Sequence, residues 1–281
     1  MSGQALELLH AAASGGANAA PPLLFVHGAY SAANCWQQHF LPWFSQQGYD
    51  CWALSLRGHG NSPGRDRLHS YGIADYVADV AWACGQLPQP PVLLGHSMGG
   101  FVIQQYLRQH TAPAAVLLAS VPPGGLALST WRLALTAPDI LLGLNLFQQG
   151  KHQPTAEEVR RMLLSPDVDP ASAQWLASNC QVESQRAVMD MTLTTALFTR
   201  HLPCPALSLV GRNDLLVSPL EATSGGHLLG ISITVLPELG HMLMLDHRWQ
   251  SVAQTVADWL ARQFPQPAVV RGQLAGRGKV C

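Results

Sequence analysis

The pattern of apolar and polar positions along the chain predicts strands that alternate with helices. Short apolar runs, two of which end at a glycine, have the form of buried parallel strands. These runs occupy residues 6–9, 22–28, 49–56, 91–95, 114–121, 206–210 and 232–236. Longer segments between them are helix-like, and they occupy residues 34–47, 71–87, 98–110 and 248–264. The alternation predicts an α/β fold whose sheet is mostly parallel and flanked by helices on both faces.

One long interval interrupts this alternation. Between residues 122 and 202 the chain has helix-like segments separated by proline and glycine, and no convincing strand. Ligands of open α/β sheets bind beyond the carboxyl ends of the strands, so we expect this insertion to cover that edge as a helical cap. The predicted core is therefore residues 1–121 and 203–264, the predicted cap is residues 122–202, and residues 265–281 are a predicted flexible tail.

Two serines lie in the pattern G-x-S-x-G, which is typical of a strand–turn–helix that carries a nucleophile: Ser62 in G-N-S-P-G and Ser97 in G-H-S-M-G. The turn also needs a backbone N–H on the residue after the serine, because that N–H donates to an oxyanion. Ser62 is followed by Pro63, which has no N–H, and no strand directly precedes it. Ser97 follows a predicted strand, precedes a predicted helix and is followed by Met98. We therefore predict that Ser97 is the nucleophile and that Met98 supplies an oxyanion donor.

A serine hydroxyl needs a base that accepts its proton, and the chain has twelve histidines from which to choose. His241 lies between the last predicted strand and the final helix, at the sheet edge that also carries Ser97. Asp214 follows the strand at residues 206–210 and lies at the same edge. The order Ser, Asp, His is that of a known triad, in which His241 would be the base and Asp214 would orient it.

Other acids and histidines are weaker candidates for this chemistry. Asp246 follows His241 closely, but it lies near the start of the last helix, where a local salt bridge is expected. Asp139 and Asp190 belong to the insertion. Packing or structural hydrogen bonding is the favoured interpretation for three histidines near the motifs: His27, His59 and His96.

Five motifs occur in the order and at the spacing found in one family. They are H-G-A-Y at residues 27–30, R-G-H-G-N-S at 57–62, G-H-S-M-G at 95–99, G-R-N-D at 211–214 and G-H at 240–241. Over roughly residues 5–264 the chain thus resembles the α/β-hydrolase fold proteins that have a helical cap. The resemblance implies that the N–H of Ala29 is the second oxyanion donor and that residues 57–62 form a structural loop. The short N-terminal region departs from the family, because it leaves room for little of the family's first hairpin.

Composition narrows the choice of partners and cofactors. Only 12% of residues are charged and the formal net charge is −1, which gives no reason to expect nucleic acid or an anionic membrane as a partner. The chain has no H-E-x-x-H motif and no clustered metal ligands, so we expect no metal, and the chemistry of the predicted triad requires no organic cofactor. The six cysteines are scattered without a C-x-x-C pair, as in a reduced protein. Without a signal peptide or an apolar run of ~20 residues, the sequence predicts a cytoplasmic protein.

The insertion is rich in large apolar residues, most of which we expect to pack the cap onto the core. A minority should line an apolar acyl pocket. The pocket candidates are Tyr30, Trp131, Phe147, Trp175 and Met242. The leading hypothesis is a carboxylesterase for small or medium apolar esters. Thioesterase, lactonase, carbon–carbon bond hydrolase and haloperoxidase-like activities use the same triad, and a slow receptor-like protein could keep it. These alternatives stay open, as does the oligomeric state.

Overall fold

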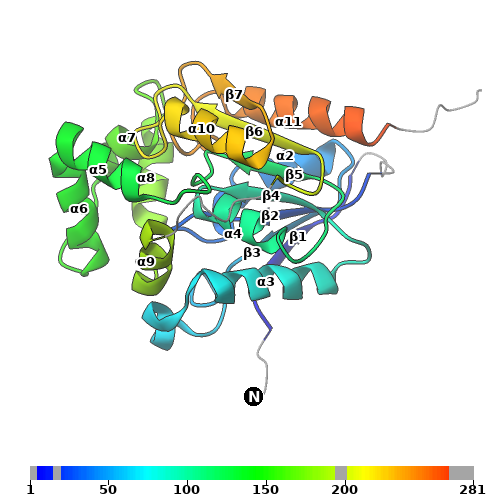
Figure 1. Cartoon of the computed structure of the whole chain (residues 1–281), viewed down its shortest axis with the longest axis horizontal. Helices are drawn as coiled ribbons and strands as arrows, with labels where there is room; N and C mark the ends of the chain where they lie inside the picture. Colours follow the sequence, from blue (N-terminus) through cyan, green and yellow to red (C-terminus); the bar gives the residue numbers. More distant parts are fainter. Residues whose placement is uncertain (1–4, 15–19, 194–200, 266–281) are drawn as a thin grey trace, which may run out of the picture.

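The computed structural model describes residues 5–14, 20–193 and 201–265, so the predicted tail from residue 266 on lies outside the described residues. Seven strands form one sheet in the order β1-β3-β2-β4-β5-β6-β7 (Figure 1). They are β1 (Leu8–Ala11), β2 (Leu23–Val26), β3 (Cys51–Leu54), β4 (Val92–His96), β5 (Ala115–Leu118), β6 (Ala206–Gly211) and β7 (Ile233–Leu236). β1 pairs antiparallel with β3, and the other neighbouring pairs are parallel. The predicted α/β-hydrolase fold is confirmed.

Both faces of the sheet are covered by helices, because successive strand residues point to opposite faces and nearly all of them are apolar. Phe25 and Leu94 pack in one core cluster, with residues of α2 and α11. Leu24 and Leu93 pack in a second cluster, with residues of α3 and α4. The core helices are α1 (Asn34–Gln37), α2 (Phe40–Gln46), α3 (Ile73–Gln86), α4 (Met98–Tyr106), α10 (Pro219–Leu229) and α11 (Trp249–Gln263), with a short 3-10 helix, η1 (Arg65–Ser70).

Two helices differ from the sequence prediction. The helix expected over residues 34–47 is divided into α1 and α2, because His39 has non-helical backbone angles. Helix α10 was not predicted at all, since Gly225 and Gly226 lower its helix propensity. Those glycines are needed for packing: a Cβ at Gly226 would lie 2.6 Å from the Ile233 side chain. The S-x-x-E capping box that begins at Ser218 was the signal that could have revealed this helix.

The insertion between β5 and β6 forms five helices in its described part, and Figure 1 shows them together at one end of the sheet. They are α5 (Ala127–Thr136), α6 (Pro138–Gln148), α7 (Ala156–Leu163), α8 (Pro170–Asn179) and α9 (Gln185–Leu193). No strand lies among residues 122–193, as the sequence predicted.

A buried hydrogen-bond network connects this insertion to the core. Glu183, between α8 and α9, has a fully buried side chain. Its Oε2 lies 3.1 Å from His59 Nε2, and its Oε1 accepts from the Tyr76 hydroxyl at 2.8 Å and the Ser184 N–H at 2.6 Å. Burial alone would raise the pKa of Glu183, but His59 and these donors outweigh burial and lower it. Glu183 is therefore a buried carboxylate that depends on its core partners.

We expect Glu183→Gln to lower the free energy of unfolding by about 3–5 kcal/mol, because it leaves the buried network without its carboxylate. Urea denaturation measures this loss. Since the pKa of Glu183 is depressed, its contribution is present above the ordinary glutamate range and is lost as the pH falls through the folded-state pKa. The matched control is Glu157→Gln, which removes an exposed pair with Arg160 on α7. Equal effects of the two substitutions would contradict the structural role of Glu183.

Candidate active site

Ser97 lies in a strained turn between β4 and α4. Its backbone angles are φ +49° and ψ −114°, which a non-glycine residue adopts only where the surrounding structure enforces it. Hydrogen bonds to the end of β5 and the loop after it supply that restraint. The Ser97 N–H donates to the Leu118 carbonyl at 3.0 Å, and the Val121 N–H donates to the Ser97 carbonyl at 3.2 Å. The turn presents the side chain of Ser97 at the carboxyl edge of the sheet.

Two glycines allow the helix to start this close to the strands. A Cβ at Gly95 would lie 2.6 Å from the Gly100 nitrogen, and a Cβ at Gly99 would lie 2.4 Å from the Val26 carbonyl oxygen. Neither contact is possible for a residue with a side chain, so both positions require glycine. The predicted strand–turn–helix at Ser97 is thus present. Ser62 instead lies in a loop, where its hydroxyl donates to the Ser55 carbonyl.

The structure brings Ser97, His241 and Asp214 together in one chain of hydrogen bonds. His241 Nε2 lies 3.0 Å from Ser97 Oγ, and His241 Nδ1 lies 2.8 Å from Asp214 Oδ2. Asp214 Oδ1 accepts from the N–H groups of Leu216 and Val217, both at 2.8 Å. Because a carboxylate only accepts, His241 donates from Nδ1 and turns the lone pair of Nε2 toward the serine hydroxyl. This arrangement can deprotonate Ser97 as the serine attacks a carbonyl.

His96, next to Ser97 in sequence, contacts the loop of His241 and not the serine. Its Nε2 donates to the His241 carbonyl at 3.1 Å, and the two rings meet edge to face with centroids 4.8 Å apart. Burial, reinforced by the proximity of His241, lowers the pKa of His96 well below its ordinary value. A neutral His96 places no second positive charge beside His241 when that imidazole accepts a proton.

His27 holds the peptide group between Gly28 and Ala29, which contains the predicted oxyanion donor, the Ala29 N–H. Its Nδ1 donates to the Gly28 carbonyl at 2.8 Å, and its Nε2 accepts from the Leu56 N–H at 3.1 Å. Burial, then the nearby His59, lowers the pKa of His27 to about 3, so the ring is neutral with one donor and one acceptor nitrogen. In a trans peptide the C=O and N–H point in opposite directions, so the Ala29 N–H is directed away from His27.

An apolar cavity of about 450 Å³ opens beside Ser97 and is lined by residues of both the core and α5–α9. Ala29, Met98 and His241 form part of its wall at the serine. Three of the predicted pocket residues also line it: Tyr30, Phe147 and Met242. Many of the other lining side chains are aliphatic, among them Leu126, Leu133, Ile140, Leu144, Leu163 and Val188. The volume is within the usual range for small-molecule sites, about 300–1,000 Å³.

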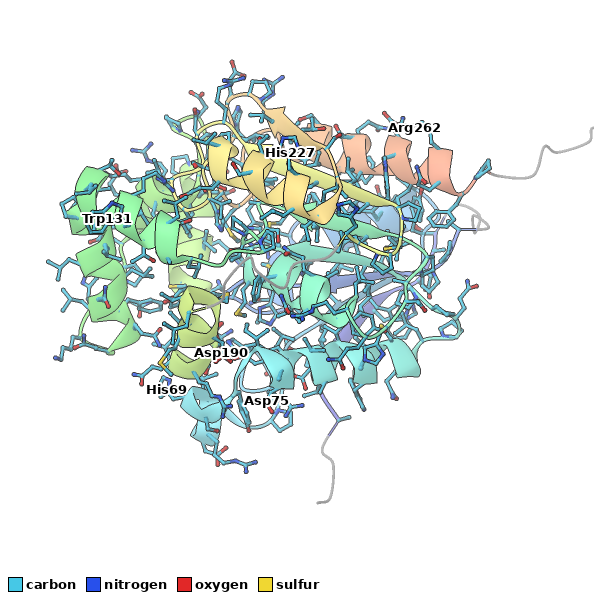
Figure 2. The ribbon with its side chains drawn as sticks, in the orientation of Figure 1. His69, Asp75, Trp131, Asp190, His227 and Arg262 are labelled. Atoms are coloured by element: carbon cyan, nitrogen blue, oxygen red, sulfur yellow. The ribbon has the colours of Figure 1, made fainter. Side chains whose placement is uncertain are left out.

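The structure places the other two predicted pocket residues elsewhere. Trp131 is 65% exposed and stands on the outer side of α5 (Figure 2). The inward side of that helix carries the buried Ser129 and Leu133. Trp175 on α8 packs against the core cluster around α2 and α11. Large aromatic side chains suggested a pocket wall, but the helical face on which each residue lies decides its position.

Several residues that hold the site together were not predicted. Asp246 is fully buried, and its Oδ2 accepts from the Gly240 N–H at 2.8 Å and from the Ser165 N–H at 2.9 Å. It therefore holds the backbone beside His241 and is not the partner of the imidazole. Its position after four apolar residues was a usable signal, because a carboxylate in a buried run must find donors.

Gln181, between α8 and α9, holds the loop on the other side of the serine. Its backbone N–H donates to the Tyr30 carbonyl at 3.0 Å, and its side-chain amide donates to the Ser31 carbonyl at 2.8 Å. Both carbonyls follow Ala29 in the chain, and Tyr30 has a positive φ of 63°. Nothing in the local pattern of residues 179–184 indicated this contact.

No group of three or more His, Cys, Asp or Glu side chains within residues 5–14, 20–193 and 201–265 could hold a metal ion. Over the same residues, no helix combines the length and the hydropathy that a membrane span requires.

Comparisons with known proteins agree with this architecture. The thermophilic esterase of Thermogutta terrifontis superposes with a TM-score of 0.71 at 19% identity, over 92% of this chain and 94% of that one. The monoacylglycerol lipase of Paleococcus ferrophilus superposes with a TM-score of 0.68 at 17% identity, over 92% of this chain and 100% of that one. These likenesses concern the fold.

Two sequence relatives match a shorter segment. Protein phosphatase methylesterase 1 of Bos taurus is 33% identical over 104 residues, which are 36% of this chain and 27% of that protein. A monoacylglycerol lipase of Mycolicibacterium smegmatis is 33% identical over 89 residues, which are 30% of this chain and 31% of the lipase. The matched segment thus spans less than a third of either relative. The sequence profile of the alpha/beta hydrolase family matches residues 23–255, so the chain belongs to that family.

Proposed function

We propose that this protein hydrolyses neutral carboxylic esters with apolar acyl groups, through an acyl-enzyme on Ser97. The observation that carries the proposal is the hydrogen-bonded chain of Ser97, His241 and Asp214 at the wall of an apolar cavity. The names of the relatives support it, since a methylesterase and monoacylglycerol lipases act on esters.

The geometry supports a two-step reaction. Ser97 Oγ attacks the ester carbonyl while its proton passes to His241 Nε2, and Asp214 stabilises the resulting imidazolium. The N–H groups of Met98 and Ala29 are the proposed oxyanion donors, and each such donor is worth about 10²–10³ in rate. His241 then protonates the leaving alcohol. A water molecule then attacks the acyl-enzyme while its proton passes to His241. When the tetrahedral intermediate collapses, His241 returns that proton to Ser97 Oγ and the carboxylic acid is released.

The charge of the cavity favours a neutral substrate over an acidic one. Among the described lining residues, Arg161 is the single arginine or lysine, and it pairs with Asp139. A carboxylate or phosphate carried by the substrate would therefore lose its hydration without gaining an ionic partner. This favours simple esters over substrates that bear an acidic group, including acidic carrier thioesters.

The test is hydrolysis of p-nitrophenyl esters of increasing acyl length, with mono-p-nitrophenyl suberate beside p-nitrophenyl octanoate. We expect turnover of about 1 s⁻¹ or more on the preferred acyl length. We expect kcat/KM to fall at least about 10-fold when the octanoyl chain ends in a carboxylate, because among the described lining residues the one arginine is already paired with Asp139. Equal or better hydrolysis of the suberate would refute the neutral-substrate proposal. A folded protein that hydrolyses none of the esters would refute ester hydrolysis itself.

A further inference from the structure

Arg132 on α5 reaches from the insertion to the loop that carries Asp214. Its Nη2 donates to the carbonyl oxygens of Leu215 at 2.8 Å and Leu216 at 3.2 Å. The guanidinium also contacts the Glu221 carboxylate, with Nη2 3.2 Å from Oε2 and Nε 3.4 Å from Oε1. Arg132 is 26% exposed and Glu221 is 5% exposed, so this contact is largely shielded from solvent.

The two carbonyls belong to the same peptide groups that bind Asp214. The Leu215 carbonyl and the Leu216 N–H form one peptide group, and the Leu216 carbonyl and the Val217 N–H form the next. Both N–H groups donate to Asp214 Oδ1 at 2.8 Å. Because C=O and N–H point in opposite directions in a trans peptide, Arg132 holds one end of each group while Asp214 is bound at the other.

The arrangement also polarises these hydrogen bonds. A cation that binds a peptide carbonyl draws electron density from the N–H of that peptide, which makes the N–H a stronger donor. Arg132 thereby makes the N–H groups of Leu216 and Val217 stronger donors to one oxygen, Asp214 Oδ1. With Oδ1 held in this way, Oδ2 stays directed at His241 Nδ1. The charge of Arg132 is balanced by Glu221. Arg132 therefore acts on Asp214 through the two peptide groups.

We propose that Arg132 is a positioning residue for Asp214: it fixes and polarises the two peptide groups that orient the carboxylate toward His241. The inference rests on the proposed function, since its rate effect is read as ester hydrolysis on Ser97. It extends that function by making the insertion a part of the acid–base machinery as well as a cover for the cavity.

The test compares Arg132→Met and Arg132→Lys with Arg160→Met. Arg160 also lies on the insertion, but it is paired with Glu157 at the surface and does not line the cavity. We expect Arg132→Met to lower kcat about 10- to 100-fold through misalignment of the reacting groups. We expect KM to stay within about twofold, because no substrate contact is removed. Arg132→Lys keeps the charge but not the fork of donors, and we expect an intermediate kcat. Arg160→Met should retain the wild-type kcat.

A second readout separates positioning from general stability and does not depend on turnover. The proton that His241 Nδ1 donates to Asp214 should give a downfield NMR resonance, which His241→Gln abolishes. Arg132→Met should shift or broaden this resonance, whereas Arg160→Met should not, even if both lower the Tm. This signal also tests the inference if the protein proves inactive on esters.

A wild-type kcat and an unshifted resonance in folded Arg132→Met would overturn the proposal, as would equal losses in Arg160→Met. If Arg132→Met does not fold, Arg132→Lys decides the question. A lowered kcat with an unchanged KM and a shifted resonance then supports positioning, and wild-type behaviour in both measurements overturns it.

Discussion

Ser97→Ala is expected to lower kcat for ester hydrolysis about 10⁶-fold, the loss that removal of a triad nucleophile typically causes. The reason is that Ser97 Oγ lies 3.0 Å from His241 Nε2 and, in the proposed mechanism, is the atom that bonds to the acyl group. The side chain is small and partly exposed to the cavity, so its removal should leave the Tm close to that of the wild type. Steady-state assays on the preferred p-nitrophenyl ester measure the loss.

The second G-x-S-x-G serine is the matched control. Ser62→Ala removes a hydroxyl that donates to the Ser55 carbonyl and accepts from the Glu7 N–H. We expect it to cost stability and to leave kcat unchanged. A fluorophosphonate probe should label the wild type and Ser62→Ala at one serine, and it should not label Ser97→Ala. Labelling of Ser97→Ala at ordinary rates would show that another residue is the nucleophile.

Asp214→Asn is expected to lower kcat about 10⁴-fold, because an amide in this place favours the wrong tautomer of the imidazole. The carboxylate Oδ2 accepts the Nδ1 proton of His241 and so leaves Nε2 unprotonated toward Ser97. An amide nitrogen at that position would donate to Nδ1, and the proton would move to Nε2. The histidine could then no longer accept the proton of Ser97. We expect the loss in kcat with little change in KM, measured by the same assay.

Asp246→Asn is the comparison variant. It distinguishes a carboxylate that orients the His241 imidazole from one that supports the loop on which His241 lies. Both carboxylates are buried near His241, but Asp246 accepts from the backbone N–H groups of Gly240 and Ser165. We expect its amide variant to lower the Tm clearly and to lower kcat far less than Asp214→Asn. If the two variants lose kcat equally, the assignment of Asp214 as the orienting acid is wrong.

How much of this molecule could be predicted depended on how local the deciding interactions are. Strands such as β2 and β4 are short and apolar on both faces, so composition alone identified them. Ser97, Asp214 and His241 each lie within five residues of the end of a strand, and parallel strands bring their carboxyl ends to one edge. Their meeting could therefore be predicted without knowledge of any side-chain contact.

The sequence predicted that the insertion is helical, but it did not predict how those helices pack against the core. The pattern of residues 122–202 indicated helices, and helices are present in its described part. Which face of α5 turns inward depends on how that helix packs against the Asp214 loop. That packing put Trp131 outside and Arg132 against the carbonyls of Leu215 and Leu216. Contacts between residues more than eighty positions apart leave no periodic signal in the sequence.

The buried anchors of the insertion limit how this protein can be recombined with its relatives. An insertion grafted from another family member would have to supply a carboxylate for His59 and Tyr76 in place of Glu183. It would also need a donor for the Asp246 carboxylate in place of Ser165. Without these groups the graft would leave buried polar side chains unpaired in the recipient core, at a cost of about 1–3 kcal/mol for each. Transplanting a new specificity onto this scaffold therefore requires exchange of the anchor residues together with the helices that line the cavity.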